Sequence, residues 1–425
     1  MAAVEAVVVG AGLRGAEVYG RFASSHPDRL RVVALAEPDE GRRRAMARAH
    51  DLPDEACFED WRGLFAAAQR APVAIVATGD TEHVGPALRA LETGHHLLLE
   101  KPMAPDPRDC IRLVEAAERA GRILQIGHVL RYTPFYEQVH ALVAEGRIGR
   151  LLHLELKEHV AHWHMAHSYV RGKFRNREVA APLILAKSCH DLDLLVWLSG
   201  ERPTRVASFG GRHEFHVDLA PDGAPARCTD GCPVQETCLH DAERFYLGPD
   251  DGLARFFPWS DVSPEPSRAA RRRALETGRY GRCVYRCDND QPDHQIVMVE
   301  FASGASASFT VQGMAAQEER TLRLTGSTGE LRGALRAGVI ELVRPGSLEV
   351  ERFEFEGSMV GHYGGDDGLI DHFTRVVAEG GASRASGRSA LDGHLLGFAA
   401  EQARHSGQVI DFEAWHRGLV AEGTR

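Results

Sequence analysis

Two short segments of the sequence carry side chains that could move a proton during a reaction. Glu100-Lys101-Pro102 follows a short apolar run, and Lys187-Ser188-Cys189-His190-Asp191 stands at the start of a predicted helix. Lysine and histidine serve as general acids or bases because their surroundings can bring their pKa values to about 7. Oxidation of an alcohol needs such a base for the hydroxyl proton and an acceptor for the hydride. Lys101 and His190 are therefore candidate catalytic residues if the chain also binds a hydride acceptor.

A glycine-rich turn near the N-terminus offers a site for such an acceptor. Gly10-Ala11-Gly12-Leu13-Arg14-Gly15 is a GxGxxG pattern that follows a valine-rich run and opens a predicted helix. Its first glycine permits a tight turn, the second lets the backbone approach a pyrophosphate, and the third allows close packing of the helix on the strand. The N-terminus of the helix also favours an anion. The pattern predicts a dinucleotide site built on Gly10, Gly12, Leu13, Arg14 and Gly15.

Glu37 indicates which dinucleotide is bound. It ends the second predicted strand, 22 residues after Gly15, where a carboxylate hydrogen-bonds the hydroxyls of the adenosine ribose. A carboxylate at this position would repel a 2′-phosphate, so the sequence favours NAD over NADP. Arg42-Arg43-Arg44 follows and weakens that preference, since these residues form either a solvated helix face or a phosphate site.

The elements predicted around this turn alternate between strand and helix. Strands are expected over Val4–Val9, Leu30–Ala36, Val73–Thr78, His96–Leu99 and Ile123–Gly127, and helices over Gly12–Ala23, Glu40–His50, His83–Glu92 and Pro107–Ala120. This alternation is typical of a doubly wound parallel sheet, so residues 1–128 are predicted to form an NAD-binding Rossmann domain. Lys101 would then lie at the carboxyl ends of the strands, where open α/β sheets bind ligands.

The pattern changes after about residue 150. Strands are expected over Leu151–Val160, Val206–Phe209, Gln295–Phe301, Ala305–Val311, Thr321–Thr325, Gly329–Arg332, Val339–Val343 and Glu349–Phe355, and helices over Ser188–Leu198, Gly368–Glu379 and Ser389–His405. Alternating strands joined by tight turns predict an antiparallel sheet with one covered face. We therefore expect residues 129–405 to form a substrate-binding α/β domain. Residues 210–292 are polar and cysteine-rich and are predicted to be an insertion, and residues 406–425 a C-terminal tail.

A segment rich in histidine is a candidate loop over the substrate. His159, His162, His164 and His167 fall within nine residues, but their spacing matches no metal motif and no acid or cysteine stands among them. Aromatic side chains can stack on a sugar ring, and arginine and lysine can pair with an anionic group. The substrate residues expected here are Trp163, His164, Tyr169, Arg171, Lys173 and Arg175. A merely solvated basic loop is the alternative.

The predicted insertion contains five cysteines within 60 residues. They are Cys228, Cys232, Cys238, Cys283 and Cys287. A weakly structured segment has little core to order it, and a structural Zn²⁺ held by four thiolates, or by three and a histidine, would supply that order. The spacing is not CxxC, so free buried thiols and a regulatory disulfide remain open.

Composition limits the classes of protein to which the chain can belong. It has 425 residues, 44% hydrophobic and 26% charged, with a net charge of −10. This composition is that of a globular protein, and an acidic chain is a poor general binder of nucleic acid. The mean hydropathy is −0.26, and no apolar run is long enough to span a bilayer. The N-terminus lacks the basic stretch of a secretory signal, so a cytoplasmic location is expected.

Several of these motifs form one series. Thr78 with His83, Glu100-Lys101-Pro102, Gln125–Gly127 and Arg131-Tyr132 follow the glycine turn in order. With them the chain resembles the Gfo/Idh/MocA family of NAD(P)-dependent oxidoreductases from residue 4 to about 405. The resemblance implies a Rossmann domain followed by an open, mostly antiparallel sheet, substrates that are sugars, cyclitols or their derivatives, and a possible cis peptide before Pro102. It places Lys101 beside the nicotinamide and gives as further cofactor residues Thr78, His83, Glu100, Pro102 and Arg131.

The resemblance also assigns roles around the predicted helix at residue 188. The family commonly has Asp-x-x-x-His there, with the histidine as acid/base; His190 matches the histidine, but Ala186 replaces the aspartate. Lys187 would fill part of that space. Asp191 and Asp193 would position the substrate, although acids in a first helical turn are equally explained by the helix dipole.

Three functions fit this sequence. The first is an NAD-dependent dehydrogenase that oxidises a ring hydroxyl of a sugar. The second is a glycosidase that recycles NAD through transient ring oxidation, elimination, hydration and re-reduction, for which Tyr169, His164 and Lys187 supply a second acid/base. The basic loop would suit a sulfonated or carboxylated glycoside. The third is an NAD-sensing binding protein, which the presence of both Lys101 and His190 disfavours. A homo-oligomer formed through the C-terminal sheet is expected.

Overall fold

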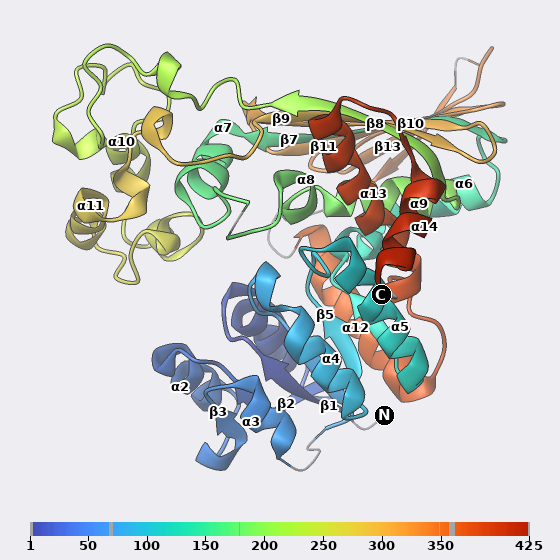
Figure 1. Cartoon of the computed structure of the whole chain (residues 1–425), viewed down its shortest axis with the longest axis horizontal. Coiled ribbons are helices and arrows are strands. Elements are labelled where there is room, and N and C mark those ends of the chain that lie inside the picture. The colour runs from blue at the N-terminus through green and yellow to red at the C-terminus, as the bar shows by residue number, and fades with distance from the viewer. Residues whose placement is uncertain (1–2, 68–70, 178, 348, 357–361, 424–425) are drawn as a thin grey trace.

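The chain is built on two β-sheets (Figure 1). A computed structural model describes residues 3–67, 71–177, 179–347, 349–356 and 362–423. The first sheet has six strands in the order β3-β2-β1-β4-β5-β6, and all of its pairs are parallel. The second has nine strands in the order β14-β13-β12-β11-β7-β10-β9-β8-β15. The predicted fold class is confirmed, and a single parallel pair, β7 with β10, interrupts the antiparallel order of the larger sheet.

The first sheet and its helices occupy the N-terminal part of the chain. The strands are β1 (Val4–Val9), β2 (Leu30–Ala36), β3 (Cys57–Phe58), β4 (Val73–Val76), β5 (His96–Leu99) and β6 (Leu124–Ile126). The helical elements are η1 (Gly15–Gly20), α1 (Arg21–Ser25), α2 (Glu40–Ala49), η2 (Asp54–Ala56), α3 (Trp61–Ala66), η3 (Asp80–Glu82), α4 (Val84–Glu92), α5 (Pro107–Ala120) and η4 (Val129–Tyr132). The valines of β1 are buried on both faces because helices cover both sides of this sheet.

The second sheet carries helices on one face. Its strands are β7 (Leu151–Ala161), β8 (Pro203–Gly211), β9 (His294–Phe301), β10 (Ser306–Ala315), β11 (Glu319–Gly326), β12 (Glu330–Ala334), β13 (Val339–Val343), β14 (Val350–Glu354) and β15 (Ile410–Asp411). The helical elements are α6 (Pro134–Ala144), α7 (His162–His164), η5 (Met165–Arg171), α8 (Leu183–Ala186), α9 (Cys189–Ser199), α13 (Gly387–Ser406) and α14 (Phe412–Gly423). Two later elements, η12 (His362–Gly364) and α12 (Gly365–Glu379), contact η4, and α12 also packs against the first sheet. Burial alternates along β7, β9 and β10 because α9 and α13 cover only one face of the sheet.

The cysteine-rich region between β8 and β9 adds no strand to either sheet. It consists of loops and short helices, namely η6 (Val217–Leu219), η7 (Cys228–Asp230), α10 (Ala242–Leu247), η8 (Leu253–Arg255), η9 (Trp259–Asp261), α11 (Arg268–Thr277), η10 (Arg279–Gly281) and η11 (Val284–Arg286). We call residues 212–293 the insertion. It projects from one end of the large sheet, on the left of Figure 1.

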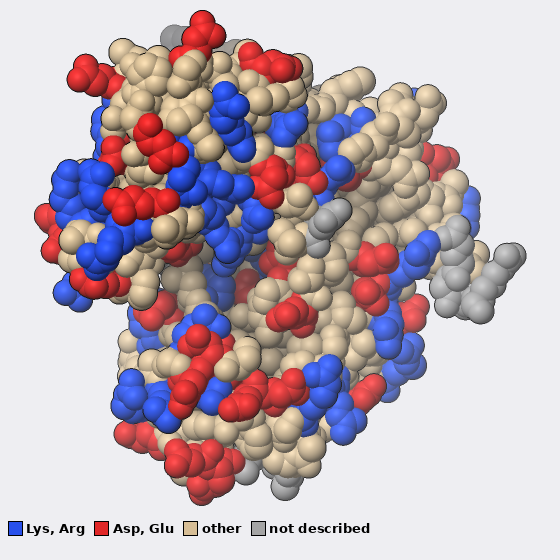
Figure 2. All heavy atoms as spheres, turned by 60° about the vertical axis from the view of Figure 1, so that its left-hand side comes forward, with Lys and Arg blue, Asp and Glu red and all other residues tan. Residues whose placement is uncertain are grey.

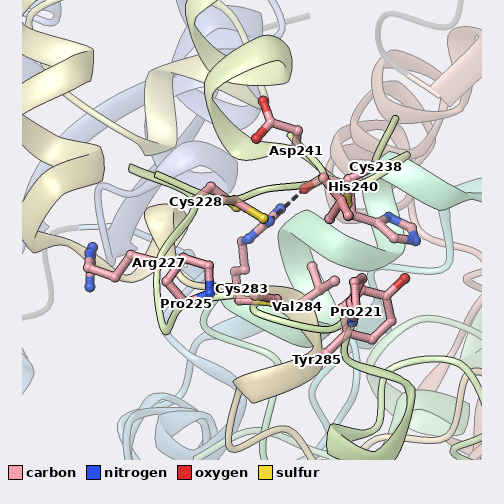
Figure 3. A pocket seen from close by; sticks show the side chains of 14 residues that line it. Pro221, Pro225, Arg227, Cys228, Cys238, His240, Asp241, Cys283, Val284 and Tyr285 are labelled. Atoms are coloured by element: carbon pink, nitrogen blue, oxygen red, sulfur yellow. Dashed lines mark hydrogen bonds between the residues drawn. The ribbon is translucent and has the colours of Figure 1, made fainter. Parts of the chain in front are cut away.

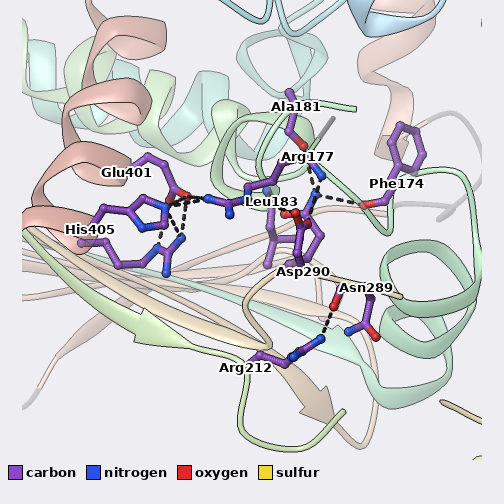
Figure 4. Close-up of polar contacts among 11 residues, drawn as sticks. Phe174, Arg177, Ala181, Leu183, Arg212, Asn289, Asp290, Glu401 and His405 are labelled. Carbon is purple, nitrogen blue, oxygen red and sulfur yellow. Dashed lines mark hydrogen bonds and ion pairs between the residues drawn. The ribbon is translucent and has the colours of Figure 1, made fainter. Parts of the chain in front are cut away.

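The insertion returns to the sheet through a set of side-chain contacts (Figure 4). The Gln291 amide accepts a hydrogen bond from Leu183 N at 2.7 Å and donates to the Phe174 and Ala181 carbonyls at 3.0 and 3.2 Å. Arg177 pairs with Asp290 at 3.3 Å. These contacts fix the start of α8, the short helix that precedes the predicted catalytic segment.

The C-terminal segment differs from the prediction. Residues 406–425 were expected to be a tail, but β15 pairs with β8 and α14 packs against α13 and β8. The apolar side chains Ile410 and Phe412, which are both buried, account for the docking of this segment. Within the described residues, no helix is both long enough and apolar enough to cross a membrane.

Candidate functional site

The glycine turn has the geometry that a pyrophosphate requires. Gly10 has φ of +94°, and a Cβ there would lie 2.7 Å from the Ala77 carbonyl oxygen. A Cβ on Gly15 would lie 1.8 Å from the carbonyl oxygen of Gly10, so helix η1 can approach β1 only with glycine at this position. Gly12, in contrast, has no heavy atom within 4 Å of its ideal Cβ. The middle of the turn therefore faces open space, which fits the passage of a dinucleotide pyrophosphate.

Glu37 lies beside this turn. It is buried, its Oε2 accepts from Ala11 N at 2.7 Å, and its Oε1 accepts from Asp39 N at 3.0 Å. Arg42 Nη2 bonds the same Oε1 at 2.6 Å, while Arg43 donates to the Glu37 carbonyl oxygen at 2.6 Å. Arg42 and Arg43, two of the three consecutive arginines, thus bond Glu37 itself. The Glu37 carboxylate lies beside the glycine turn, where the sequence predicts a contact to the ribose.

The loops after β4 and β5 are joined by His83. Its Nδ1 bonds the Pro102 carbonyl oxygen at 2.8 Å, and its Nε2 bonds the Thr78 carbonyl oxygen at 3.3 Å. His83 is fully buried, so it orders the two loops rather than facing a ligand. The Lys101–Pro102 peptide bond is cis, as the resemblance implied. The Thr78 hydroxyl is buried without a hydrogen-bond partner in the described chain, which leaves it available to a bound group.

Glu100 and Arg14 form a buried cluster under the glycine turn. Glu100 Oε1 accepts from Arg14 Nε at 2.5 Å and from the Tyr19 hydroxyl at 2.6 Å, and Arg14 Nη1 bonds Asp366 on α12 at 2.8 Å. Burial opposes the charge of Glu100, but Arg14 and the Tyr19 hydrogen bond outweigh it and lower the pKa of Glu100. Arg14 thus links the glycine turn to the residue after β5 and to α12, while Leu13 is exposed beside it.

Lys101 reaches from the end of β5 to the second sheet. Its Nζ donates to the carbonyl oxygen of Ala186 at 2.7 Å, four residues before His190. Ala186 is the position where the family commonly has an aspartate, so the lysine bonds the backbone there instead of a carboxylate. An ammonium has three donors, and no other described residue accepts one from Lys101. The remaining donors can hold a substrate hydroxyl.

His190 lies buried beside this ammonium at the start of α9. Burial and then the Lys101 charge hold the pKa of His190 well below its usual range, so the ring is neutral. Its Nδ1 has no hydrogen-bond partner in the described chain. The rings of His128 and His362 lie 5.6 and 6.4 Å away, centroid to centroid. A neutral imidazole with an unpartnered nitrogen is suited to accept a proton.

A buried charge network stands behind α9. Lys187 Nζ lies 3.5 Å from Glu158 Oε1, the Ser188 hydroxyl donates to Glu158 at 3.0 Å, and Arg320 bonds both Glu158 and Asp191. Burial raises the pKa of Asp191 to about 7 against the opposing charge of Arg320. Asp191 is therefore occupied by Arg320 rather than open to a substrate.

The histidine-rich segment contributes a histidine paired with a carboxylate. His164 Nδ1 lies 2.7 Å from Glu318 Oε1. Burial lowers the pKa of His164, and although burial opposes the charge of Glu318, the contact with His164 lowers its pKa to about 2. The pair is thus a neutral imidazole oriented by a carboxylate, with Nε2 free to exchange a proton. Tyr169, a buried residue, lies nearby, with its ring 6.1 Å from that of His164.

Other predicted substrate residues are not brought into this site. Arg171, predicted to pair with an anionic group of the substrate, is 2% exposed and donates to the carbonyl oxygens of Arg282 and His240, so the alternative of a solvated basic loop does not apply to it either. Arg175 pairs with Asp288 of the insertion at 3.0 Å. Trp163 stacks on Phe245, also in the insertion, at 5.8 Å. These side chains attach the insertion to η5.

Arg131 and Asp193, predicted for cofactor and substrate, bind each other. Arg131 Nε and Nη2 bond the two Asp193 oxygens at 2.7 and 2.6 Å, and each side chain is only 1% exposed. Their charges are satisfied internally, so neither is free for a ligand. This pair is a correction to both assignments.

The cysteines of the insertion lie in one region, with one exception. Cys228, Cys232, Cys238 and Cys283 line a single pocket together with His240 (Figure 3), whereas Cys287 does not line it and its Sγ lies 3.3 Å from the Cys283 carbonyl oxygen. In the described part of the chain, no three side chains of histidine, cysteine or acid are positioned to hold one metal ion. The set of five predicted ligands is therefore corrected to four cysteines around a shared cavity.

Sequence reasoning missed several residues of the network. Glu158 has the clearest signal, since it occupies an inward position of β7 in line with Leu154, Leu156 and Val160. A carboxylate on a buried face needs a partner, and that partner is Arg320 on β11. His128, which packs against His190, gave no local signal.

These groups meet between the two parts of the molecule. Figure 2 shows the surface hollowed between the upper and lower parts, with Lys and Arg side chains gathered above the hollow. Lys101 comes from the first sheet, and His190 and His164 come from elements of the second. The arrangement can bind a dinucleotide along the first sheet and present a hydroxyl to Lys101 and His190.

Comparison with protein-family models gives two matches. Residues 4–128 match a model described as an oxidoreductase family with an NAD-binding Rossmann fold. Residues 136–228 match a model described as a GFO/IDH/MocA C-terminal domain.

Individual proteins are similar over part or all of the chain. Inositol 2-dehydrogenase 2 of Saccharopolyspora erythraea is 33% identical over 46% of this chain and 53% of its own length. 2,7-Anhydro-N-acetylneuraminate hydratase of Escherichia coli is 27% identical over 48% of this chain and 52% of its own. The match thus spans about half the length of these curated relatives. An oxidoreductase domain protein from Kribbella flavida has a TM-score of 0.72 at 18% identity, covering 97% of this chain and 100% of its own, and shows the fold.

Proposed function

Because this chain belongs to the Gfo/Idh/MocA family of oxidoreductases, we propose that it oxidises a ring hydroxyl of a sugar or sugar derivative with NAD. Bound NAD would supply the hydride acceptor. The glycine turn and Glu37 would hold the dinucleotide, and the Thr78 hydroxyl is free to contact it. The similarity to an inositol 2-dehydrogenase supports a polyhydroxylated ring as the substrate class.

The observation that carries this proposal is the contact of Lys101 with the segment that contains His190. Lys101 Nζ is held 2.7 Å from the Ala186 carbonyl oxygen, and its charge is one cause of the lowered pKa of His190. Lys101 would hold the substrate hydroxyl and stabilise the developing alkoxide with its remaining donors. The neutral ring of His190 would accept the proton, directly or through Lys101.

Single-turnover reduction of NAD tests these roles. Lys101→Ala and His190→Ala should each slow hydride transfer by roughly 100- to 10,000-fold, the usual span for general acid–base groups. NAD affinity should barely change, since neither residue is on the glycine turn. Lys157→Ala and His153→Ala on β7 are matched controls, because these side chains pair with Glu155 and Ser306 instead. Hydride transfer at the wild-type rate in His190→Ala would place the base elsewhere.

The His164–Glu318 pair favours a second candidate, a glycosidase that recycles NAD. Such a cycle oxidises a ring hydroxyl, removes the proton from the neighbouring carbon, expels the aglycone, adds water across the double bond and reduces the ketone again. The proton on carbon requires a base other than the one on the hydroxyl, and His164 Nε2 is suited to it. The similarity to a hydratase supports chemistry of this kind.

Aryl glycosides separate the two candidates. With NAD present, a dehydrogenase accumulates NADH in proportion to substrate and releases no aglycone, whereas a glycosidase releases aglycone with at most one NADH per chain. Glu318→Gln should lower aglycone release by roughly 100-fold or more and leave single-turnover hydride transfer unchanged. If Glu318→Gln affects neither readout, His164 is not a catalytic base.

The uncovered face of the second sheet supports the expected homo-oligomer. Phe209, Ile296 and Met298 are exposed on neighbouring strands, and Phe209 pairs with Ile296 in the sheet register. An exposed apolar patch on a sheet face is typical of a protein interface. We propose that this face contacts a second copy of the chain. Phe209→Glu should convert the oligomer to a monomer in light scattering, and an unchanged mass would refute the assignment.

A further inference from the structure

The insertion encloses a cavity whose lining is unusual for a small loop region (Figure 3). Cys228, Cys232 and Cys238 come from one loop, and Cys283 comes from a second loop 45 residues further on. The two loops are joined by a bridge between Arg227 and Arg282 and by a hydrogen bond from Cys283 N to the Ala226 carbonyl oxygen at 2.9 Å. The backbone therefore brings the four thiols to one place.

His240 provides an independent sign that the cavity takes a ligand. It lines the cavity, its side chain is 1% exposed, and neither ring nitrogen has a hydrogen-bond partner in the described chain, since Glu214 Oε1 lies 3.9 Å from Nε2. A buried polar group without a partner costs free energy. The nitrogen lone pair of a buried imidazole is therefore expected to accept a hydrogen bond or to bind a metal ion. A metal ion would accept that lone pair.

Arg171 indicates the charge of the group that the cavity would hold. Its guanidinium is buried, donates to the Arg282 and His240 carbonyl oxygens, and lies 3.7 Å from Cys228 Sγ. It forms no ion pair with a carboxylate of the described residues. A buried cation without a counter-charge is strongly destabilising. Thiolates around a divalent metal carry the negative charge that would balance Arg171.

We propose that Cys228, Cys232, Cys238 and Cys283 bind one structural zinc ion, with His240 able to replace one thiolate. The cavity is about 20 Å³, room for about one water-sized body, which suits a single ion rather than an iron–sulfur cluster. The four thiols are not positioned to bind one ion together, so zinc binding requires their side chains to rotate toward the cavity. Cys232 and Cys238 are partly exposed, which leaves room for such a rotation.

The core of the insertion shows why it needs this ion. Its own cluster of buried apolar residues consists of Cys228, Ala242, Tyr246, Leu247 and Leu275, with Phe245, Trp259, Val262 and Tyr280 packed against it. Such a small core gives a region of some 80 residues little stability of its own, and a bound metal would add to it. The insertion also holds the loop that carries His164, since Tyr280 stacks on His167 at 4.6 Å. The zinc would thus keep one wall of the candidate substrate site in place.

Elemental analysis of the full-length protein, purified without chelator, is the primary test. We expect about one zinc per chain. Because His240 can replace only one thiolate, the double variant Cys228→Ser/Cys283→Ser should lower the zinc content at least tenfold, whereas Cys287→Ser should retain it because that side chain does not line the cavity. Cobalt exchanged for zinc should show the visible bands of a tetrahedral thiolate site.

A measurement on the wild-type protein tests the proposal even if the variants fail to fold. Titration of thiols with a mercurial should release zinc in step with the modification of four cysteines, and NAD affinity should stay unchanged. The proposal is overturned if the folded protein contains no zinc. It is also overturned if the protein contains iron together with inorganic sulfide, or if its intact mass shows that these cysteines form disulfides. Equal loss of zinc in Cys287→Ser would overturn the ligand set.

Discussion

Replacement of Asp193 by asparagine separates a structural from a substrate-binding role. Asp193 and Arg131 make two parallel hydrogen bonds of 2.7 and 2.6 Å, and the guanidinium also donates to the carbonyl oxygens of Arg384 and Ser389. Asp193→Asn keeps the size of the side chain but removes its negative charge. It also places the amide N–H₂ group, a donor, against an N–H donor of Arg131. Arg131 is left as a buried cation without a counter-charge.

The magnitude follows from the burial of both partners. Each is 1% exposed, and removal of one partner from a buried ion pair costs about 3–5 kcal/mol. Equilibrium denaturation by urea measures this loss as a decrease in the free energy of unfolding. Trp197 is a local fluorescence probe, because its ring centroid lies 5.5 Å from the Arg131 guanidinium carbon.

A surface pair of the same geometry supplies the control. Arg388 bonds both oxygens of Glu118 at 2.9 and 2.7 Å, but the two side chains are 58% and 52% exposed. Glu118→Gln should cost only about 0–1 kcal/mol. If Asp193→Asn remains within about 1 kcal/mol of wild type and instead raises the KM for substrate, then Asp193 binds the substrate and the reasoning fails.

Three further predictions concern the glycine turn and two buried histidines. Gly12→Ala should fold normally but bind NAD more than tenfold more weakly in calorimetric titration, since its Cβ enters the open space of the turn. Gly15→Ala should instead destabilise the fold, which thermal melting measures. Burial and the neighbouring ammonium hold the pKa of His190 well below 6.5, so kcat/KM should stay constant as pH falls through 6.5, and an acid limb at 6.5 or above would contradict its role. Burial lowers the pKa of His394 to about 3, and its Nε2 accepts from the Met103 amide, so the unfolded chain binds a proton below pH 6.5 that the folded state excludes. From this histidine alone the free energy of unfolding should therefore fall by about 1.6 kcal/mol between pH 6.5 and pH 5, and urea titrations of His394→Gln should lack that part of the fall.

Much of the first domain could be predicted because its signals are local. The valine run of β1, the glycine turn and the start of the next helix follow one another without interruption, and each depends on residues a few positions apart. The helix over Pro107–Ala120 is likewise predictable, since Asp106 caps its first turn and Gly121 ends it with φ of +60°. The parallel pairing of β7 with β10 could not be predicted, because it joins strands about 150 residues apart.

The sequence by itself determined which chemical groups the chain possesses and the order of the elements that carry them. Residue type and spacing alone give the glycines at 10, 12 and 15, the carboxylate at 37, Lys101 after the end of a strand and His190 at the start of a helix. These features were predictable because turn geometry, burial on both faces of a strand and the start of a helix are properties of neighbouring residues.

Only the tertiary structure decided which of the charged groups remain free. Arg131 and Asp193 are 62 residues apart and neutralise each other, Arg171 is buried against the insertion, and Glu158 pairs with Arg320 on another strand. Among the described residues, in contrast, the Lys101 ammonium donates to one backbone carbonyl and keeps its other donors. A charge buried in a protein must be compensated by whichever partner the fold brings to it, so availability for a ligand depends on contacts between distant segments, which no local pattern encodes.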